Sequence, residues 1–138
     1  RYLEPSHESP TISVNGGATS LELKQGYVHL KRQWQKGDVI EINLPMSIRR
    51  VLSHENVKEN VGCVAVERGP IVYCAEAIDN GGHALDLSLA DKVTLSTHQE
   101  KDLLGGVIAI KGGDLTLIPY YAWSHRGEGE MAVWLKRG

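Results

Sequence analysis

The stretch Val64-Ala65-Val66-Glu67-Arg68-Gly69-Pro70-Ile71-Val72-Tyr73-Cys74 sets two short apolar runs on either side of a break. Runs rich in β-branched and aromatic residues and bounded by Gly or Pro are typical of β-strands. The break predicts either a hairpin or a sharp kink in one long strand. Glycine accepts a positive φ or a close backbone approach at such a point, so Arg68, Gly69 and Pro70 are predicted to form a structural turn.

Similar short segments, which alternate apolar and polar residues and end at turn residues, recur in both directions from this stretch. The predicted strands cover residues 11–14, 21–24, 27–31, 39–44, 48–51, 64–66, 71–73, 85–89, 93–95, 107–110, 115–118 and 131–135. Residues 79–82 are predicted to form an exposed loop, and residues 96–102 a polar stretch without a strand. No window has the 3.6-residue period that a helix needs over ~10–12 residues. We therefore predict an all-β fold, an antiparallel β-sandwich of jelly-roll-like form.

Pro45 cannot donate to a strand ladder, and the predicted boundary between two domains lies beside it. Residues 1–46 supply about four strands, too few for a sandwich with its own core, and are predicted to be an incomplete sandwich portion. Residues 47–138 supply enough strands for one complete sandwich. Because the chain begins at Arg1 without an initiator Met, we expect it to be part of a longer protein. The apolar strands of the incomplete portion are also expected to favour homo-association.

The composition excludes several functions. A formal net charge of -2 and a pI near 6.3 offer no electrostatic reason to bind nucleic acid or an anionic membrane, and no apolar run approaches the ~20 residues of a membrane helix. Cys63 and Cys74 match no zinc-binding spacing. They are predicted to be reduced side chains that pack as small hydrophobes, which favours a reducing, cytoplasmic compartment. A disulfide between them is the alternative if Arg68-Gly69 forms a two-residue turn.

Four stretches carry a resemblance to a known family. They are Gly26-Tyr27-Val28-His29-Leu30 with Trp34 and Gly37-Asp38, then Ile42-Asn43-Leu44-Pro45-Met46, then residues 66–74, and finally Ile118-Pro119-Tyr120-Tyr121-Ala122-Trp123 with Val133-Trp134-Leu135. In this order they resemble the C-terminal end of glycoside hydrolase family 127, the β-L-arabinofuranosidase-like proteins. The resemblance implies that residues 1–46 are the later strands of a middle β-sandwich and that residues 47–138 are the C-terminal sandwich.

The same resemblance implies a catalytic (α/α)6 barrel ahead of the two sandwiches. Its chemistry uses a cysteine nucleophile, a zinc ion held by cysteines and a glutamate, and a second glutamate as acid/base. All of these residues belong to the barrel, so no catalytic, cofactor-binding or metal-binding residue carries over to this chain. We therefore expect a non-catalytic region whose partner is the barrel of the parent chain.

Tyr120, Tyr121 and Trp123 are the candidates for contact with another molecule. One interpretation is that Tyr121 and Trp123 pack on a neighbouring domain while Tyr120 and Trp134 fill the core. The alternative is a carbohydrate-binding module in which exposed aromatic rings stack on sugars. Three residues that could be mistaken for catalytic groups are predicted to have structural roles. Glu128 and Glu130 are predicted to be solvated turn residues. Cys74 lies in an apolar strand and is predicted to be a core residue without a thiolate.

Overall fold

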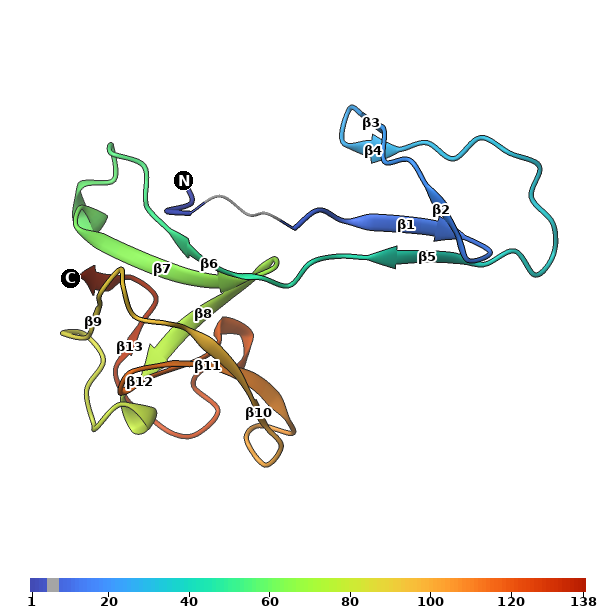
Figure 1. The fold of residues 1–138 in the computed structure, drawn as a ribbon. Helices are drawn as coiled ribbons and strands as arrows, with labels where there is room; N and C mark the ends of the chain where they lie inside the picture. Colours follow the sequence, from blue (N-terminus) through green and yellow to red (C-terminus); the bar gives the residue numbers. More distant parts are fainter. Residues whose placement is uncertain (5–7) are drawn as a thin grey trace. The chain divides into compact units, whose positions relative to one another are not determined.

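The computed structural model describes residues 1–4 and 8–138 of the chain (Figure 1). Its regular elements are β-strands joined by turns and three short 3-10 helices, which confirms the all-β prediction. The chain divides into two compact units, the N-terminal unit within Ser6–Pro45 and the C-terminal unit, which combines Arg1–Pro5 with Met46–Gly138. No helix in the described residues has the length and apolar character needed to cross a membrane.

The N-terminal unit contains two small antiparallel sheets. Strands β1 (Thr11–Val14), β2 (Gly17–Thr19) and β5 (Ile40–Asn43) form one, in the order β2-β1-β5, and strands β3 (Leu23–Lys24) and β4 (Tyr27–Val28) form the other. Asn15 and Gly16 have φ values of 53° and 76°, as the two central residues of a tight hairpin turn require. The Asn15 side chain also donates to Asp38 and accepts from the Val39 amide, both at 2.9 Å, so one side chain ties the hairpin to the segment before β5.

Few apolar side chains of the N-terminal unit are buried. Ile12 and Val14 on β1 are below a tenth exposed, whereas Ile42 opposite Ile12 is 63% exposed. Other exposed apolar side chains in this unit are Leu21, Leu23, Tyr27, Trp34, Val39, Ile40 and Leu44. Strand β5 is also an edge of its sheet, so the unit presents both unpaired backbone and uncovered apolar surface.

The C-terminal unit contains a nine-stranded sheet. Its strands are β6 (Ile48–Val51), β7 (Cys63–Arg68), β8 (Ile71–Glu76), β9 (Ser88–Leu89), β10 (Ser96–Glu100), β11 (Val107–Gly112), β12 (Leu115–Pro119), β13 (Met131–Ala132) and β14 (Leu135–Arg137). The 3-10 helices are η1 (Lys58–Asn60), η2 (Ala77–Asp79) and η3 (Tyr120–Ala122). Eight of the nine strands overlap predicted strand segments, the exception being β10. One pairing differs from the expectation of an antiparallel sheet, because β14 runs parallel to β9.

The break at Gly69 is a hairpin turn. Arg68 pairs with Ile71, so Gly69 and Pro70 form the two-residue loop, and Gly69 has a φ of 56°. A positive φ followed by the fixed negative φ of proline is the pattern of a type II′ turn. Gly69 is buried. Its amide donates to the Ser47 carbonyl at 3.2 Å, and its carbonyl accepts from Arg49 at 3.2 Å. This register does not place Cys63 opposite Cys74, and both are free thiols.

The hairpin opens soon after its turn, which creates the core. Strands β7 and β8 share two residue pairs; beyond them β14 pairs with β7, and β13 and β12 pair with β8. Figure 1 shows the two strands diverging from the turn. The arms of this curled sheet enclose one apolar cluster, to which both contribute: Val64, Val66, Tyr73, Ala75, Ala84, Leu89, Ile110, Leu115, Leu117 and Leu135.

The outer face of the β8–β12 pair is buried as well. Successive side chains on a strand point to opposite faces, so Cys74 and its neighbour Ile118 point away from the main cluster. They pack with Val107 and Ala122 under the partly buried Leu103, Leu104, Met131 and Val133. Cys74 is therefore a core residue.

Several predicted segments differ from the structure. Residues 96–102, predicted to be a polar stretch, contain β10, an edge strand that pairs with β11 through its backbone. Residues 93–95 were predicted to be a strand, but they form none. They pack closely against Gly112, where an added Cβ atom would lie only 2.6 Å from Leu95 Cδ2. The strand predicted over residues 131–135 is divided into β13 and the start of β14, which continues to Arg137. Within residues 85–89 only the short strand β9 forms.

Residues 79–82 were predicted to be an exposed loop, but Asn80 within them is buried. Its side chain is 8% exposed and donates to the Glu76 carbonyl at 2.8 Å and the Thr116 carbonyl at 3.0 Å. It also accepts from the Thr116 amide at 2.9 Å. One buried amide thus satisfies backbone groups of both β8 and β12, which is the usual condition for burying such a side chain.

Gly69→Val is expected to lower the free energy of unfolding by about 1–3 kcal/mol, because a β-branched residue is strained in the left-handed region. Gly129→Val is the matched control, since Gly129 is exposed and its φ lies outside that region. Urea denaturation of both variants measures the difference. Equal losses at the two positions would mean that the Gly69 backbone carries no special constraint.

The isolated chain is expected to self-associate through the N-terminal unit, since edge strands and uncovered apolar side chains favour pairing with another chain. Ile42→Glu should weaken this association, whereas Val61→Glu, which alters an equally exposed residue of the C-terminal unit, should not. Light scattering gives the mass, and limited proteolysis should cut residues 8–45 before residues 46–138. A monomer that resists cleavage equally in both units would contradict this.

Candidate functional site

The geometry of η3 divides the candidate aromatic residues into a ring pair and a single exposed tyrosine. Side chains three residues apart eclipse one another in a 3-10 helix, and the rings of Tyr120 and Trp123 accordingly lie 6.1 Å apart between centroids, tilted by 35°. Ala122 points into the apolar cluster around Cys74. Tyr121 is 65% exposed, so the helix gives Tyr121 a different direction from the Tyr120–Trp123 pair.

Tyr120 is 44% exposed, which corrects the interpretation in which Tyr120 fills the core. Trp134 is half-buried. The sequence suggested one aromatic set, and the structure divides it into a ring pair and a separate exposed tyrosine.

Trp123 lines a pocket of about 410 Å³ in the C-terminal unit. The opposite walls come from η2, through Ile78, and from the loop that carries Arg126, Glu128 and Glu130. The pocket is therefore concave and combines an indole ring with charged groups. A pocket of this size that joins aromatic and polar groups is the usual form of a small-molecule site.

Arg126 is held by two carboxylates beneath this pocket. Its guanidinium donates to both oxygens of Asp79, at 2.8 and 2.5 Å, and to Glu76 at 2.5 Å. The Ser124 amide donates to the other Glu76 oxygen at 2.7 Å. Hydrogen bonds to Asp79, with a further contribution from Glu76, raise the pKa of Arg126 above its ordinary value. These bonds fix the loop against η2, as expected for a bidentate arginine pair.

The two glutamates of the loop differ in their bonding. Glu130 accepts from the amides of Ala84 and Leu85, at 2.8 and 3.3 Å, and these bonds lower the pKa of its carboxyl group. Glu130 is exposed, as predicted for a solvated turn residue, and its carboxylate also serves as a structural acceptor. Within residues 1–4 and 8–138, Glu128 has no hydrogen bond or ion pair and faces the pocket.

Arg49 of strand β6 holds the turn at Gly69. The Arg49 guanidinium bonds the Gly69 carbonyl, pairs with Glu67 at 2.7 Å and stacks 4.0 Å from the Tyr2 ring centroid. Arg68 lies instead beside Tyr73, whose hydroxyl donates to the Ile108 carbonyl at 2.8 Å. Desolvation is the main cause that raises the pKa of Tyr73.

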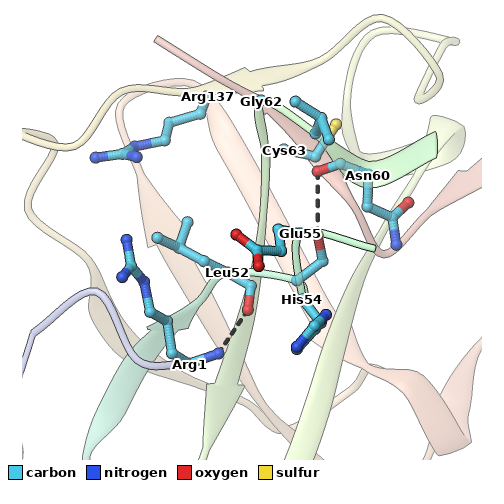
Figure 2. A pocket seen from close by; sticks show the side chains of 10 residues that line it. Arg1, Leu52, His54, Glu55, Asn60, Gly62, Cys63 and Arg137 are labelled. Carbon is cyan, nitrogen blue, oxygen red and sulfur yellow. Dashed lines mark hydrogen bonds between the residues drawn. The ribbon is translucent and has the colours of Figure 1, made fainter. Parts of the chain in front are cut away.

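A second pocket, of about 440 Å³, lies in the C-terminal unit between Arg1, His54, Cys63 and Arg137 (Figure 2). Its edges are joined by backbone contacts, such as the bond from the Arg1 amine to the Leu52 carbonyl at 2.7 Å. His54 accepts through Nδ1 from the Asn56 amide, and no hydrogen bond in the described residues joins it to Cys63. The pocket therefore lacks the base-to-nucleophile contact that cysteine catalysis requires.

Cys74 does not have the properties of a nucleophile. It is fully buried, and desolvation, aided by the negative charge of Glu76, raises the pKa of its thiol to about 12. Reactive cysteines need a lowered pKa and some access to solvent. Within the described residues, no three His, Cys, Asp or Glu side chains come together as metal ligands would.

Comparison with known proteins identifies relatives for both units. A model described as the glycoside hydrolase family 127 C-terminal domain matches residues 48–136, and one described as the middle domain of that family, β-L-arabinofuranosidase, matches residues 5–46. A non-reducing end β-L-arabinofuranosidase from Bifidobacterium longum is 36% identical over 96% of this chain. That alignment covers 24% of the relative's length, so the chain spans about a quarter of it.

Solved structures agree with these matches. A family 127 β-L-arabinofuranosidase from Geobacillus stearothermophilus is 36% identical with a TM-score of 0.88, over 95% of this chain and 25% of that one. A family 127 β-arabinofuranosidase is 38% identical with a TM-score of 0.91, over 99% of this chain and 24% of that one. The family resemblance inferred from the sequence is confirmed.

Glu130→Gln should make thermal stability less dependent on pH. The folded-state pKa of Glu130 is lowered, so its stabilising contribution is complete above the unfolded-state pKa of about 4.3 and is lost as pH falls through the folded value. The Tm of the variant should be lower than wild type at pH 7, and the gap should shrink as pH falls below the unfolded-state pKa towards the lowered folded-state pKa. Glu128→Gln, the control, should leave Tm unchanged; a gap of constant size, or the same gap for Glu128→Gln, would contradict the assignment.

Proposed function

Because this chain belongs to glycoside hydrolase family 127, we propose that it is the non-catalytic C-terminal β region of a β-L-arabinofuranosidase-like hydrolase and that it packs against and stabilises the catalytic barrel of that protein. Residues 1–46 are the later strands of the middle sandwich in this proposal, and residues 47–138 are the C-terminal sandwich. The free thiols of Cys63 and Cys74 favour a reducing, cytoplasmic compartment.

The observation that carries the proposal is the share of each relative that the chain covers. Nearly all of this chain aligns with the two solved family enzymes, yet it accounts for only about a quarter of either one. In those proteins this region is thus joined to a much larger remainder. The remaining three quarters or so of a homologous chain could therefore cover the surfaces that this chain leaves exposed.

Those surfaces support a docking role. Tyr121 is among the most exposed large side chains of the C-terminal unit, and it lies on the side of η3 that serves neither the core nor the pocket. In the N-terminal unit most apolar side chains are uncovered. Covering such groups removes apolar area from water, at about 25 cal/mol per Å², so contact with the rest of the parent chain would stabilise both partners.

The chemical groups also favour a structural role over catalysis. Cys74 is buried and protonated, while Glu76 and Glu130 are engaged by Arg126 and by backbone amides. Retaining hydrolysis by carboxylates needs two groups about 5–5.5 Å apart. Glu128 is the pocket carboxylate left without a bond in the described residues, and it has no second free carboxylate beside it there.

The test compares the isolated chain with a longer protein that carries residues 1–138 after a barrel. The isolated chain should release no product from an aryl β-L-arabinofuranoside, with or without zinc. Tyr121→Asp should leave the stability of the isolated chain nearly unchanged and destabilise the longer protein by about 2 kcal/mol, as expected for a buried aromatic contact.

Leu85→Asp is the matched control, since Leu85 is as exposed as Tyr121 and is not part of η3. Equal effects of Tyr121→Asp in both proteins would assign this residue a role inside the chain. Zinc-dependent turnover by the isolated chain, abolished by Cys74→Ala, would contradict the non-catalytic assignment.

A further inference from the structure

We propose that the pocket beside Trp123 binds one sugar unit of a glycan, with the indole ring as its apolar platform and Glu128 as its hydrogen-bond acceptor. This site is separate from the docking role, because docking involves Tyr121 on another side of η3. The proposal rests on the pocket, on the bonding of its walls and on the membership of the chain in a family of glycoside hydrolases.

The aromatic wall is suited to a sugar. Trp123 lines the pocket and is 37% exposed, so part of its surface is available to a ligand. The ring of Tyr120 lies beside it at 6.1 Å, and the Trp123 amide donates to the Tyr120 carbonyl at 3.3 Å. This neighbour restricts the indole orientation. A sugar presents one face of C–H groups, and a held aromatic ring with an apolar surface is the complement of such a face.

The polar wall is held in place before any ligand arrives. Arg126 is bonded to Glu76 and Asp79, and the Ala77 amide donates to the Glu130 carbonyl at 2.9 Å. The loop from residue 124 to residue 130 is therefore anchored at both ends to η2 and its neighbours. A preformed site loses less conformational entropy on binding.

Glu128 is the group left for a ligand. It lies between Gly127, where a Cβ atom would have no heavy atom within 4 Å, and Gly129, so the backbone around it is open. A carboxylate accepts hydrogen bonds at both oxygens, which matches two neighbouring hydroxyl groups of a sugar. The carboxylates of Glu76 and Glu130 also line the pocket and disfavour an anion there.

A cationic ligand would also be attracted to Trp123 and Glu128, through cation–π contact and charge. The pocket differs from a dedicated cation site because the charge of Glu76 is already paired with Arg126, and because Glu130 keeps one oxygen, Oε1, beside the two amide bonds to Oε2. The pocket therefore offers hydrogen-bond acceptors on Glu128 and Glu130 next to the apolar side chains of Trp123 and Ile78. That combination favours a neutral polyhydroxylated ligand.

The test is titration of the 138-residue chain with methyl glycosides of arabinofuranose, xylopyranose and glucopyranose, followed by the indole N–H signals in two-dimensional NMR. At least one glycoside should shift the Trp123 signal saturably, with a Kd on the order of 1 mM. Trp123→Ala should weaken binding about tenfold or more, and Glu128→Gln several-fold, because the amide keeps one acceptor oxygen. Trp34→Ala, which removes an exposed tryptophan of the N-terminal unit, should leave the Kd unchanged.

Lysine amide is titrated in parallel as the cationic probe. Saturable binding of lysine amide that is lost in Glu128→Gln, with no saturable binding of any glycoside, would overturn the proposal, as would glycoside binding that survives Trp123→Ala. Dispersed NMR signals of each variant report its folding. Trp123→Phe, which keeps a smaller aromatic surface, should show intermediate affinity, and it replaces Trp123→Ala if the alanine variant unfolds.

Discussion

The turn at Gly69 and Pro70 is the constraint on which the C-terminal unit depends. It joins β7 to β8 through two residue pairs, after which the strands separate and other strands take their free edges. The separation lets Val64 and Tyr73 contribute to one core from opposite arms of the sheet. The turn itself is held by β6, because Ser47 and Arg49 bond the backbone of Gly69. A kink in one continuous strand would leave both arms in one layer, without an enclosed core.

The end of β12 shows how a short element distributes residues among several roles. Pro119 leads into η3, and a 3-10 turn repeats every three residues, so three successive positions point in three directions. Ala122 packs beside Cys74, Tyr121 faces solvent, and Tyr120 shares its side with Trp123. The proposed docking surface and the pocket thus use different side chains of the same short element. Occupation of one does not require the other to be vacant.

Local patterns were sufficient to predict much of the fold. Turns such as Asn15-Gly16 depend on residues that tolerate positive φ, and that preference is visible in the sequence. Strand β10 was missed because its residues are polar; it is an edge strand stabilised by backbone pairing with β11, which leaves no apolar alternation. The bonds of Arg126 were missed because its partners lie 47 and 50 positions away, and no local pattern records such a contact.

The distribution of charge around Trp123 limits what the site can do. Glu76 and Asp79 hold Arg126, and Glu130 holds the amides of residues 84 and 85. Each of these carboxylates stabilises the loop that forms the pocket. Glu128 and the second oxygen of Glu130 remain as acceptors within the described pocket, and both can accept from hydroxyl groups of the proposed sugar. The bonds that hold the loop therefore also hold the proposed binding pocket in shape before a ligand arrives.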